Sequence, residues 1–270
     1  EIYEGDLRDI LALQRDLAQA IIQEIKIKVA PQEQARLMSV RPVKPEVFDL
    51  YLKGRYYMDR LSGAGFTKAT ESFEQAIKID PEYAPAYAGL AETYLWGSFG
   101  YTGIRPRDAI PKARDAVIEA LKLDNTLAEV HISLAMLKQF EYDWLGAERE
   151  YKRALELNPS SASAHTWYAM WLTIPGRLDD AFGEIKRAQE LDPLSLSTSE
   201  MIGVMYFWDR QFDRAMEQFR KVLELDPNYS LAHYNLGLVY TEKGMYEKAI
   251  ASFQKAITLL HRLFAVRLSL

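Results

Sequence analysis

Residues 230–263, SLAHYNLGLVYTEKGMYEKAIASFQKAITLLHRL, decide the fold, because their pattern of small, apolar and aromatic residues recurs upstream at a constant spacing. Six positions recur 34 residues apart, in the pairs Ile202 and Leu236, Gly203 and Gly237, Tyr206 and Tyr240, Ala215 and Ala249, Phe219 and Phe253, and Val222 and Ala256. Pro159, Pro193 and Pro227 follow the same step at the end of ELNP, ELDP and ELDP. A period of this length indicates an array of helical repeats.

Packing explains why these residue types recur. A glycine facing an alanine, as in Gly203 with Ala215 and Gly237 with Ala249, lets two helices approach closely. A proline cannot continue a helix and pushes the residue before it out of the helical region. One helix pair cannot bury its apolar face alone, so neighbouring pairs must share a continuous core. The sequence therefore predicts an all-α fold, an α-solenoid of helix-turn-helix units.

The stretch resembles a tetratricopeptide repeat, whose pattern is W-x-x-L-G-x-x-Y, then A-x-x-x-F-x-x-A, then proline. The resemblance covers about residues 47–263 and implies a right-handed solenoid of six repeats. The first repeat carries three extra residues and the second carries ten. The predicted repeats are 47–83, 84–127, 128–161, 162–195, 196–229 and 230–263, between an N-terminal helical extension and linker (1–46) and a C-terminal tail (264–270).

Composition excludes several classes of function. The 270 residues are 49% hydrophobic and 26% charged, with a net charge of -5, so they lack the basic excess of a nucleic-acid-binding face. The absence of cysteine excludes disulfides and thiolate zinc sites. No apolar run is long enough to cross a bilayer. We expect no cofactor, no nucleic acid and no membrane insertion; the cytoplasm is favoured, but a periplasmic location also suits the chain.

Residues 6–28 form an amphipathic pattern that predicts one helix before the repeats. Two interpretations are compatible with each other: a helix that caps the first repeat, and the closing helix of a preceding domain. EGDLRDILALQRDLAQAIIQEI resembles the end of the TolB-like domain that precedes repeat arrays in some bacterial regulators. The chain begins at Glu1 without an initiator methionine, so we expect it to be part of a longer protein.

Two further phrases are more particular than the general repeat. EVFDLYLKGRYYMDR opens the first repeat and FEYDWLGAEREYKRALELNP lies in the third. Both resemble the repeat array of multidomain bacterial signalling proteins, in which the array follows a DNA-binding, kinase or cyclase head. The chain contains no phosphate-binding loop, kinase motif set or recognition-helix pattern, so its residues predict no effector activity.

The ten-residue insertion lies near WGSFGYTGIRPRDAI (96–110), where three glycines indicate irregular backbone. One interpretation is a longer first helix followed by a surface loop. The other is a protruding binding edge with aromatic and arginine side chains, Phe99, Tyr101, Arg105 and Arg107.

Three histidines, His131, His165 and His233, occupy the same position in their repeats. Successive repeats are displaced by about 10 Å, whereas metal-bound nitrogens must lie within about 2.1 Å of one ion. They cannot share a metal, so we predict that they are structural, and the same holds for His261. No serine, histidine and carboxylate grouping occurs in a catalytic context, and we predict that the chain is not an enzyme.

The resemblance implies that the first helices of the repeats line an inner, concave groove. Read at the corresponding positions, this groove is largely apolar and aromatic. The residues predicted to bind a peptide there are Trp96, Ile132, Met136, Phe140, Met170, Val204, Phe207, Trp208, Tyr234 and Leu238. The alternative is that they only pack between neighbouring helices. Chaperone-binding relatives clamp a terminal carboxylate with several polar groove residues. In this chain only Asn235 matches one of them, so the clamp is absent.

The sequence thus predicts a protein- or peptide-binding scaffold, the interaction module of a larger bacterial signalling or transcription regulator, whose partner supplies apolar or aromatic anchors. The alternative function is a small-molecule-sensing array that gates an attached enzyme or DNA-binding domain. At the C-terminal edge, residues 261–270 continue the apolar pattern without a polar capping helix. This edge predicts a homodimer, with a frayed tail as the alternative.

Overall fold

The computed structural model describes residues 43–60, 62–98 and 104–265, with side chains up to Leu259. The chain divides into two compact units, Glu1–Asp49 and Leu50–Leu270, and the fold given below is that of the second unit. The helix expected at 6–28, and Phe99 and Tyr101 of the insertion, lie outside the described residues.

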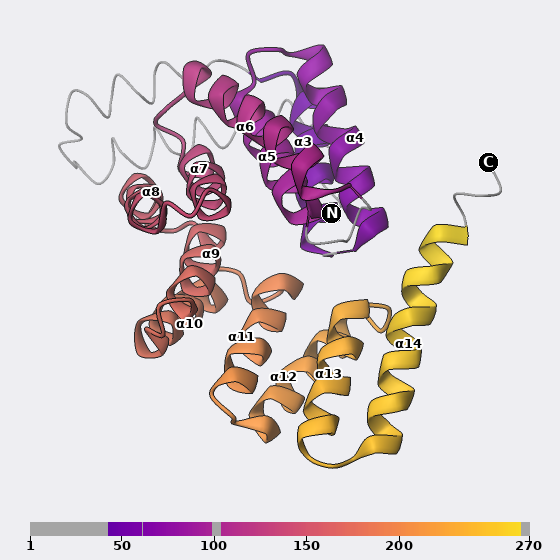
Figure 1. Cartoon of the computed structure of the whole chain (residues 1–270). Coiled ribbons are helices and arrows are strands. Elements are labelled where there is room, and N and C mark those ends of the chain that lie inside the picture. The colour runs from indigo at the N-terminus through magenta and orange to yellow at the C-terminus, as the bar shows by residue number, and fades with distance from the viewer. Residues whose placement is uncertain (1–42, 61, 99–103, 266–270) are drawn as a thin grey trace, which may run out of the picture. The chain divides into compact units, whose positions relative to one another are not determined.

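The described chain is helical throughout, with no strand among its residues, so the prediction of an all-α solenoid is confirmed (Figure 1). The helices follow one another in antiparallel pairs. Their bounds are α3 Pro45–Asp59, α4 Gly63–Ile79, α5 Ala84–Trp96, α6 Pro106–Leu123, α7 Ala128–Phe140, α8 Trp144–Leu157, α9 Ala162–Thr173, α10 Leu178–Leu191, α11 Leu196–Trp208, α12 Phe212–Leu225, α13 Ser230–Glu242 and α14 Tyr246–Ala265.

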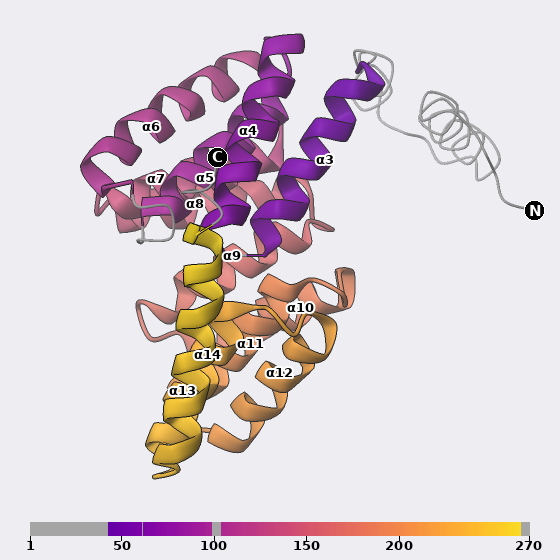
Figure 2. The same ribbon diagram turned by 90° about the vertical axis from the view of Figure 1, so that its right-hand side faces the viewer.

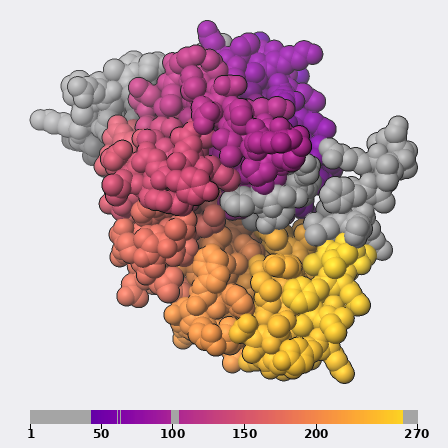
Figure 3. Space-filling model, in the orientation of Figure 1, coloured from indigo at the N-terminus to yellow at the C-terminus, as the bar shows by residue number. Residues whose placement is uncertain are grey.

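The first helices of the pairs form the inner face of the solenoid. Each of α5, α7, α9 and α11 packs against the first helix of the next pair as well as against its own partner, whereas each second helix packs forward only onto the next first helix. The pairs therefore curve, and successive pairs follow one another across the surface in sequence order (Figure 3). Helix α14 also contacts α4, so its C-terminal end lies next to the first helix pair (Figure 2).

Two columns of small residues hold the helix pairs together. Both columns step by 34 residues, and every member is buried: Ala113, Ala147, Ala181, Ala215 and Ala249 in one, and Ala120, Ala154, Ala188, Val222 and Ala256 in the other. Because these side chains are short, the second helix of each pair can lie close to its neighbours.

The repeated glycine makes room for an aromatic ring. A Cβ atom on Gly203 would lie 2.5 Å from the Phe219 ring, and one on Gly237 would lie 2.5 Å from the Phe253 ring. The sequence predicted a close approach at these glycines but assigned it to the facing alanine. The structure shows that the phenylalanine of the second helix fills the space, so the glycine and the phenylalanine of one repeat depend on each other.

The connections between pairs use side-chain caps. After the second helix of each of the first five pairs, the side chain of an aspartate or asparagine accepts a hydrogen bond from the N–H two residues later, which stabilises the turn. These residues are Asp80, Asp124, Asn158, Asp192 and Asp226. The next helix then begins, in two cases with a serine N-cap, Ser161 before α9 and Ser195 before α11.

The three predicted structural histidines link neighbouring pairs. His131 Nε2 lies 2.9 Å from the carbonyl oxygen of Asn125, and His165 and His233 repeat this contact with the loop carbonyls of Pro159 and Pro227. In the first two cases the other ring nitrogen contacts a carboxylate of the second helix, Nδ1 of His165 lying 2.6 Å from Glu184. Each histidine therefore joins its own pair to the preceding turn.

The insertion mainly lengthens the connection and the second helix of its pair. Helix α5 has 13 residues, as α7 has, and a π-type turn follows at residues 97–98. Helix α6, in contrast, has 18 residues against 14 in α8. Arg105, one of the residues proposed for a protruding edge, pairs with Asp108 at 2.9 Å.

Helix α14 runs through to Ala265. Its Ile250 and Ile257 side chains are exposed, while Leu259 is buried. The predicted dimer depends on the side chains after Leu259, which lie outside the described residues and leave the dimer a prediction. Among the helices that the structure describes, none combines the length and the hydropathy that a membrane-spanning segment requires.

Candidate binding site on the inner face

An apolar pocket of about 320 Å³ lies between α5, α7, α8 and α9. Four of the residues predicted for the groove line it: Trp96, Met136, Phe140 and Met170. The other lining residues are Gln139, Tyr142, Trp144, Tyr151, Trp167 and Ile174. The volume is at the small end of the range for ligand pockets, about 300–1,000 Å³, and matches a single large side chain better than an extended ligand.

The pocket is electrically neutral, since no charged side chain lines it. Its one amide, Gln139, accepts a hydrogen bond at 2.6 Å from the hydroxyl of the buried Tyr151, and burial raises the pKa of that hydroxyl. The oxygen of Gln139 is therefore occupied, and its N–H groups remain as donors toward a ligand. Such a lining suits an uncharged apolar or aromatic group next to a carbonyl oxygen.

Exposed aromatic side chains form the rim of this pocket at the turn between α7 and α8. Tyr142 is 78% exposed and Trp144 is 41% exposed, and their rings meet edge to face at 5.9 Å. Covering apolar surface of this kind is favourable by about 25 cal/mol per Å². The turn therefore presents apolar surface beside an apolar pocket.

Tyr142 also has an unfavourable backbone. Its φ is 63°, in the left-handed region, and the residues 34 and 102 positions later, Gly176 and Gly244, have φ values of 78° and 69°. The fourth member of the series, Arg210, has φ 60°. Left-handed backbone costs a residue with a Cβ atom about 1–2 kcal/mol, which glycine avoids. Tyrosine and arginine thus occupy positions where the fold favours glycine.

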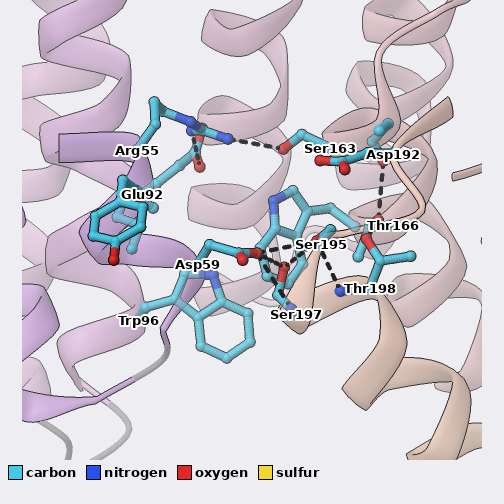
Figure 4. A pocket seen from close by; sticks show the side chains of 14 residues that line it. Arg55, Asp59, Glu92, Trp96, Ser163, Thr166, Asp192, Ser195, Ser197 and Thr198 are labelled. Carbon is cyan, nitrogen blue, oxygen red and sulfur yellow. Dashed lines mark hydrogen bonds and ion pairs between the residues drawn. The ribbon is translucent and has the colours of Figure 1, made fainter. Parts of the chain in front are cut away.

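A second cavity, of about 310 Å³, adjoins the first and is polar (Figure 4). It lies between α3, α5, α9 and the beginning of α11. The two cavities share Trp96 and Trp167, whose ring centroids are 4.8 Å apart. An indole wall therefore separates a neutral pocket from a polar one.

Asp59, at the end of α3, closes one side of the polar cavity by binding the start of α11. Its carboxylate accepts hydrogen bonds from the backbone N–H groups of Leu196 at 3.1 Å and Ser197 at 3.2 Å. It also accepts hydrogen bonds from the hydroxyls of Ser195 and Ser197 (Figure 4). A carboxylate is stabilised at a helix N-terminus by the free N–H groups and the helix dipole. Asp59 thereby ties the first helix pair to the fifth.

Arg55, one turn before Asp59, holds a buried carboxylate in the same cavity. One of its guanidinium nitrogens lies 2.9 Å from Oε2 of Glu92, and another donates to Ser163 at 3.2 Å (Figure 4). Glu92 is fully buried, and burial raises its pKa while Arg55 opposes that rise. The pair therefore joins α3 to α5 one helical turn before Trp96.

The remaining six predicted groove residues do not reach either cavity. Ile132 is fully buried and contributes only to the core, so it offers a ligand no surface. Val204, Phe207 and Leu238 are half-buried, whereas Trp208 and Tyr234 are exposed. These five residues lie on α11 and α13, and no lining residue of the apolar pocket comes from those helices.

Sequence reasoning missed Tyr142, Trp144 and Trp167 in the apolar pocket and Arg55 and Asp59 in the polar cavity. One signal for Tyr142 was present: in register with Gly176 and Gly244, it is an aromatic residue where two repeats have glycine. Arg55 and Asp59 had no such signal, because their partners lie up to 138 residues away in sequence.

The stacked helix pairs define a helical-repeat solenoid, and both cavities lie on its inner face. Sequence models of the tetratricopeptide repeat match residues 142–195, 205–244 and 230–262. These parts of the chain are therefore tetratricopeptide repeats, and the resemblance recognised in the sequence is confirmed.

Two curated bacterial proteins are similar to half of the chain. The putative adenylate cyclase 3 of Rhizobium meliloti is 28% identical over 137 residues, which are 50% of this chain and 23% of that protein. The transcriptional regulator HilA of Salmonella typhimurium is 26% identical over 133 residues, 49% of this chain and 24% of that protein. The chain therefore matches only about a quarter of the length of either relative.

A solved structure with the same fold is the human IFIT1 dimer with m7Gppp-AAAA. It has a TM-score of 0.65 and 19% sequence identity, and the match covers 90% of this chain and 54% of that one. At this identity the likeness shows the shared solenoid fold alone.

Proposed function

We propose that this array binds a protein partner through an extended segment whose apolar or aromatic side chain enters the pocket of Trp96, Met136, Phe140 and Met170. The observation that carries the proposal is the chemistry of that pocket: it is side-chain sized, has no charged lining residue and opens beside exposed aromatic rings. Tetratricopeptide repeats are protein-interaction scaffolds, and an apolar anchor in a central pocket is how such interfaces gain most of their affinity.

We further propose that the array is the interaction module of a larger bacterial regulator. The two curated relatives have different activities by name, a cyclase and a transcriptional regulator, while both resemble this chain over a similar length. This supports a shared repeat array joined to different effector heads. The catalytic or DNA-binding activity then belongs to the head, and the array itself has no catalytic role. The resemblance of residues 4–25 to the end of a TolB-like domain suits the same arrangement.

Binding of synthetic peptides tests the first proposal. The probes are fluorescein-labelled nonapeptides of glycine and serine with one central residue, which is tryptophan, leucine, lysine or aspartate. We expect the tryptophan and leucine peptides to bind more tightly than the charged ones, as measured by fluorescence anisotropy.

Two substitutions then locate the site. Phe140→Ala removes a pocket residue and should weaken binding of the tryptophan peptide about tenfold. Trp208→Ala, on α11, removes an exposed aromatic residue outside the pocket and should change binding less than twofold. A loss with Trp208→Ala alone would place the anchor on α11 and refute the pocket.

A further inference from the structure

We infer that the turn between α7 and α8 is a specificity element, in which Tyr142 and Trp144 clamp the anchor side chain of the partner against the apolar pocket. The inference rests on the proposed function, because it assumes that the pocket receives a peptide side chain. It goes further in assigning the choice of partner to a turn, outside the helices that the repeat pattern identifies.

The backbone of Tyr142 supports this assignment. In the 34-residue register the left-handed position carries glycine in two repeats, and tyrosine here has no burial that would offset the strain, since its side chain is 78% exposed. Its described ring contact is the edge of Trp144. Residues held in strained backbone cluster at active sites and ligand-binding sites.

Arg210 provides an internal comparison. It has the same left-handed backbone in the same register, and its guanidinium lies over the Phe212 ring at 5.5 Å, as Tyr142 meets Trp144 two residues later. Arg210, however, does not line the apolar pocket, whereas Tyr142 does. Local stacking is therefore common to both turns, and the pocket is what distinguishes Tyr142.

The charges around this turn identify the chemistry of the partner. Lys138 pairs with Asp143 at 3.3 Å, and Glu141 pairs with Arg114 at 2.7 Å. These charges compensate one another, and the pocket beside them has none. The surface therefore matches an uncharged extended segment with one aromatic or large aliphatic side chain. The free N–H groups of Gln139 would bind a backbone carbonyl oxygen of that segment.

Matched glycine substitutions test the inference with the tryptophan nonapeptide as the probe. Tyr142→Gly and Arg210→Gly each remove the same backbone strain, so we expect similar changes in the thermal midpoint, a rise of about 2 °C. Only Tyr142→Gly should weaken peptide binding, about tenfold. Tyr142→Phe keeps the ring and should retain the affinity of the unmodified protein.

The outcomes separate the inference from the proposed function. If Phe140→Ala weakens binding but Tyr142→Gly does not, the pocket binds peptides and the turn has no part in it. If Tyr142→Gly and Arg210→Gly weaken binding equally, the effect comes from the fold, and the inference is wrong. If the tryptophan peptide does not bind the unmodified protein, both the proposed function and the inference fail.

Discussion

Two regions of the inner face each bury a glutamate, and their partners differ in charge. Glu92 on α5 is completely buried and faces the guanidinium of Arg55 at 2.9 Å. Glu200 on α11 is 5% exposed and accepts a hydrogen bond from the neutral amide of Asn235 on α13. The two acids are therefore buried to a similar depth, one beside a cation and the other beside a neutral amide.

The difference appears in how the two carboxyl groups bind protons. Burial raises the pKa of both. For Glu92, the charge and hydrogen bond of Arg55 oppose the effect of burial. For Glu200 only the hydrogen bond of Asn235 opposes it, and the pKa rises from 4.5 to about 7. Glu200 is thus a group that titrates near neutral pH inside the solenoid.

Arg55→Met should have the largest effect, because it leaves Glu92 buried without a cation. Removing one partner of a buried ion pair costs about 3–5 kcal/mol, and the partial exposure of Arg55 places the expected loss near 3 kcal/mol. The loss should be greater at pH 8 than at pH 5, because a protonated Glu92 needs no cation. Urea unfolding followed by circular dichroism at the two pH values measures it.

The double variant Arg55→Met with Glu92→Met is the control for this prediction. It replaces both members of the pair by apolar side chains of similar length, so most of the lost stability should return. If the double variant is no more stable than Arg55→Met alone, the loss arises from contacts of the arginine other than Glu92.

Glu200→Gln should remove a dependence of stability on pH. The pKa of Glu200 is higher in the folded protein than in the unfolded chain. At pH values between the two, the carboxyl group is protonated in the folded state and ionised in the unfolded state, so folding becomes less favourable as pH rises. The unmodified protein should therefore lose stability as pH rises from about 4.5 to about 7, by on the order of 2 kcal/mol. Glutamine keeps the oxygen that accepts from Asn235 but cannot ionise.

Thermal midpoints measured from pH 4.5 to pH 8 test this prediction. The curve for Glu200→Gln should be flatter than that of the unmodified protein over this interval and should lie above it at pH 8. Parallel curves would mean that Glu200 ionises as easily in the folded protein as in the unfolded chain, and the contrast with Glu92 would then disappear.

The fold could be predicted from local information, and so could four of the ten residues that line the apolar pocket. The 34-residue spacing encodes each helix pair and its contact with the next pair, which places Trp96, Met136, Phe140 and Met170 on the inner face. The five predicted residues on α11 and α13 do not reach the pocket because those helices lie farther along the solenoid, and Ile132 is buried in the core.

Contacts across the solenoid could not be predicted from the sequence, because they join repeats that are not neighbours. Asp59 meets Ser197, and Arg60 meets Asp226 at 2.8 Å, over 138 and 166 residues of sequence. Such pairs depend on the curvature accumulated over several repeats, which no single repeat encodes.

We expect the smallest loss of stability from a substitution of His165. Its pair with Glu184 lies nearer the surface than Glu92 and Glu200 do. Its Nδ1 lies 2.6 Å from Glu184, and the hydrogen bond to that carboxylate raises the pKa of His165. A histidine with a raised pKa stabilises the fold fully below its ordinary value of about 6.5, and the contribution is lost as pH rises through the folded-state value. His165→Gln should therefore cost about 0.5–1 kcal/mol at pH 6 and less at pH 8, since partly exposed pairs contribute little.

His233→Gln is the matched control, because His233 has the same loop-carbonyl contact and Ser252 stands where Glu184 would be in register. The difference between the two variants at pH 6 measures the contribution of Glu184, and it should be several times smaller than the effect of Arg55→Met. If His165→Gln instead destabilises the protein as much as Arg55→Met, the depth of burial does not set the strength of charged pairs in this solenoid, and the reasoning applied to Glu92 must be revised.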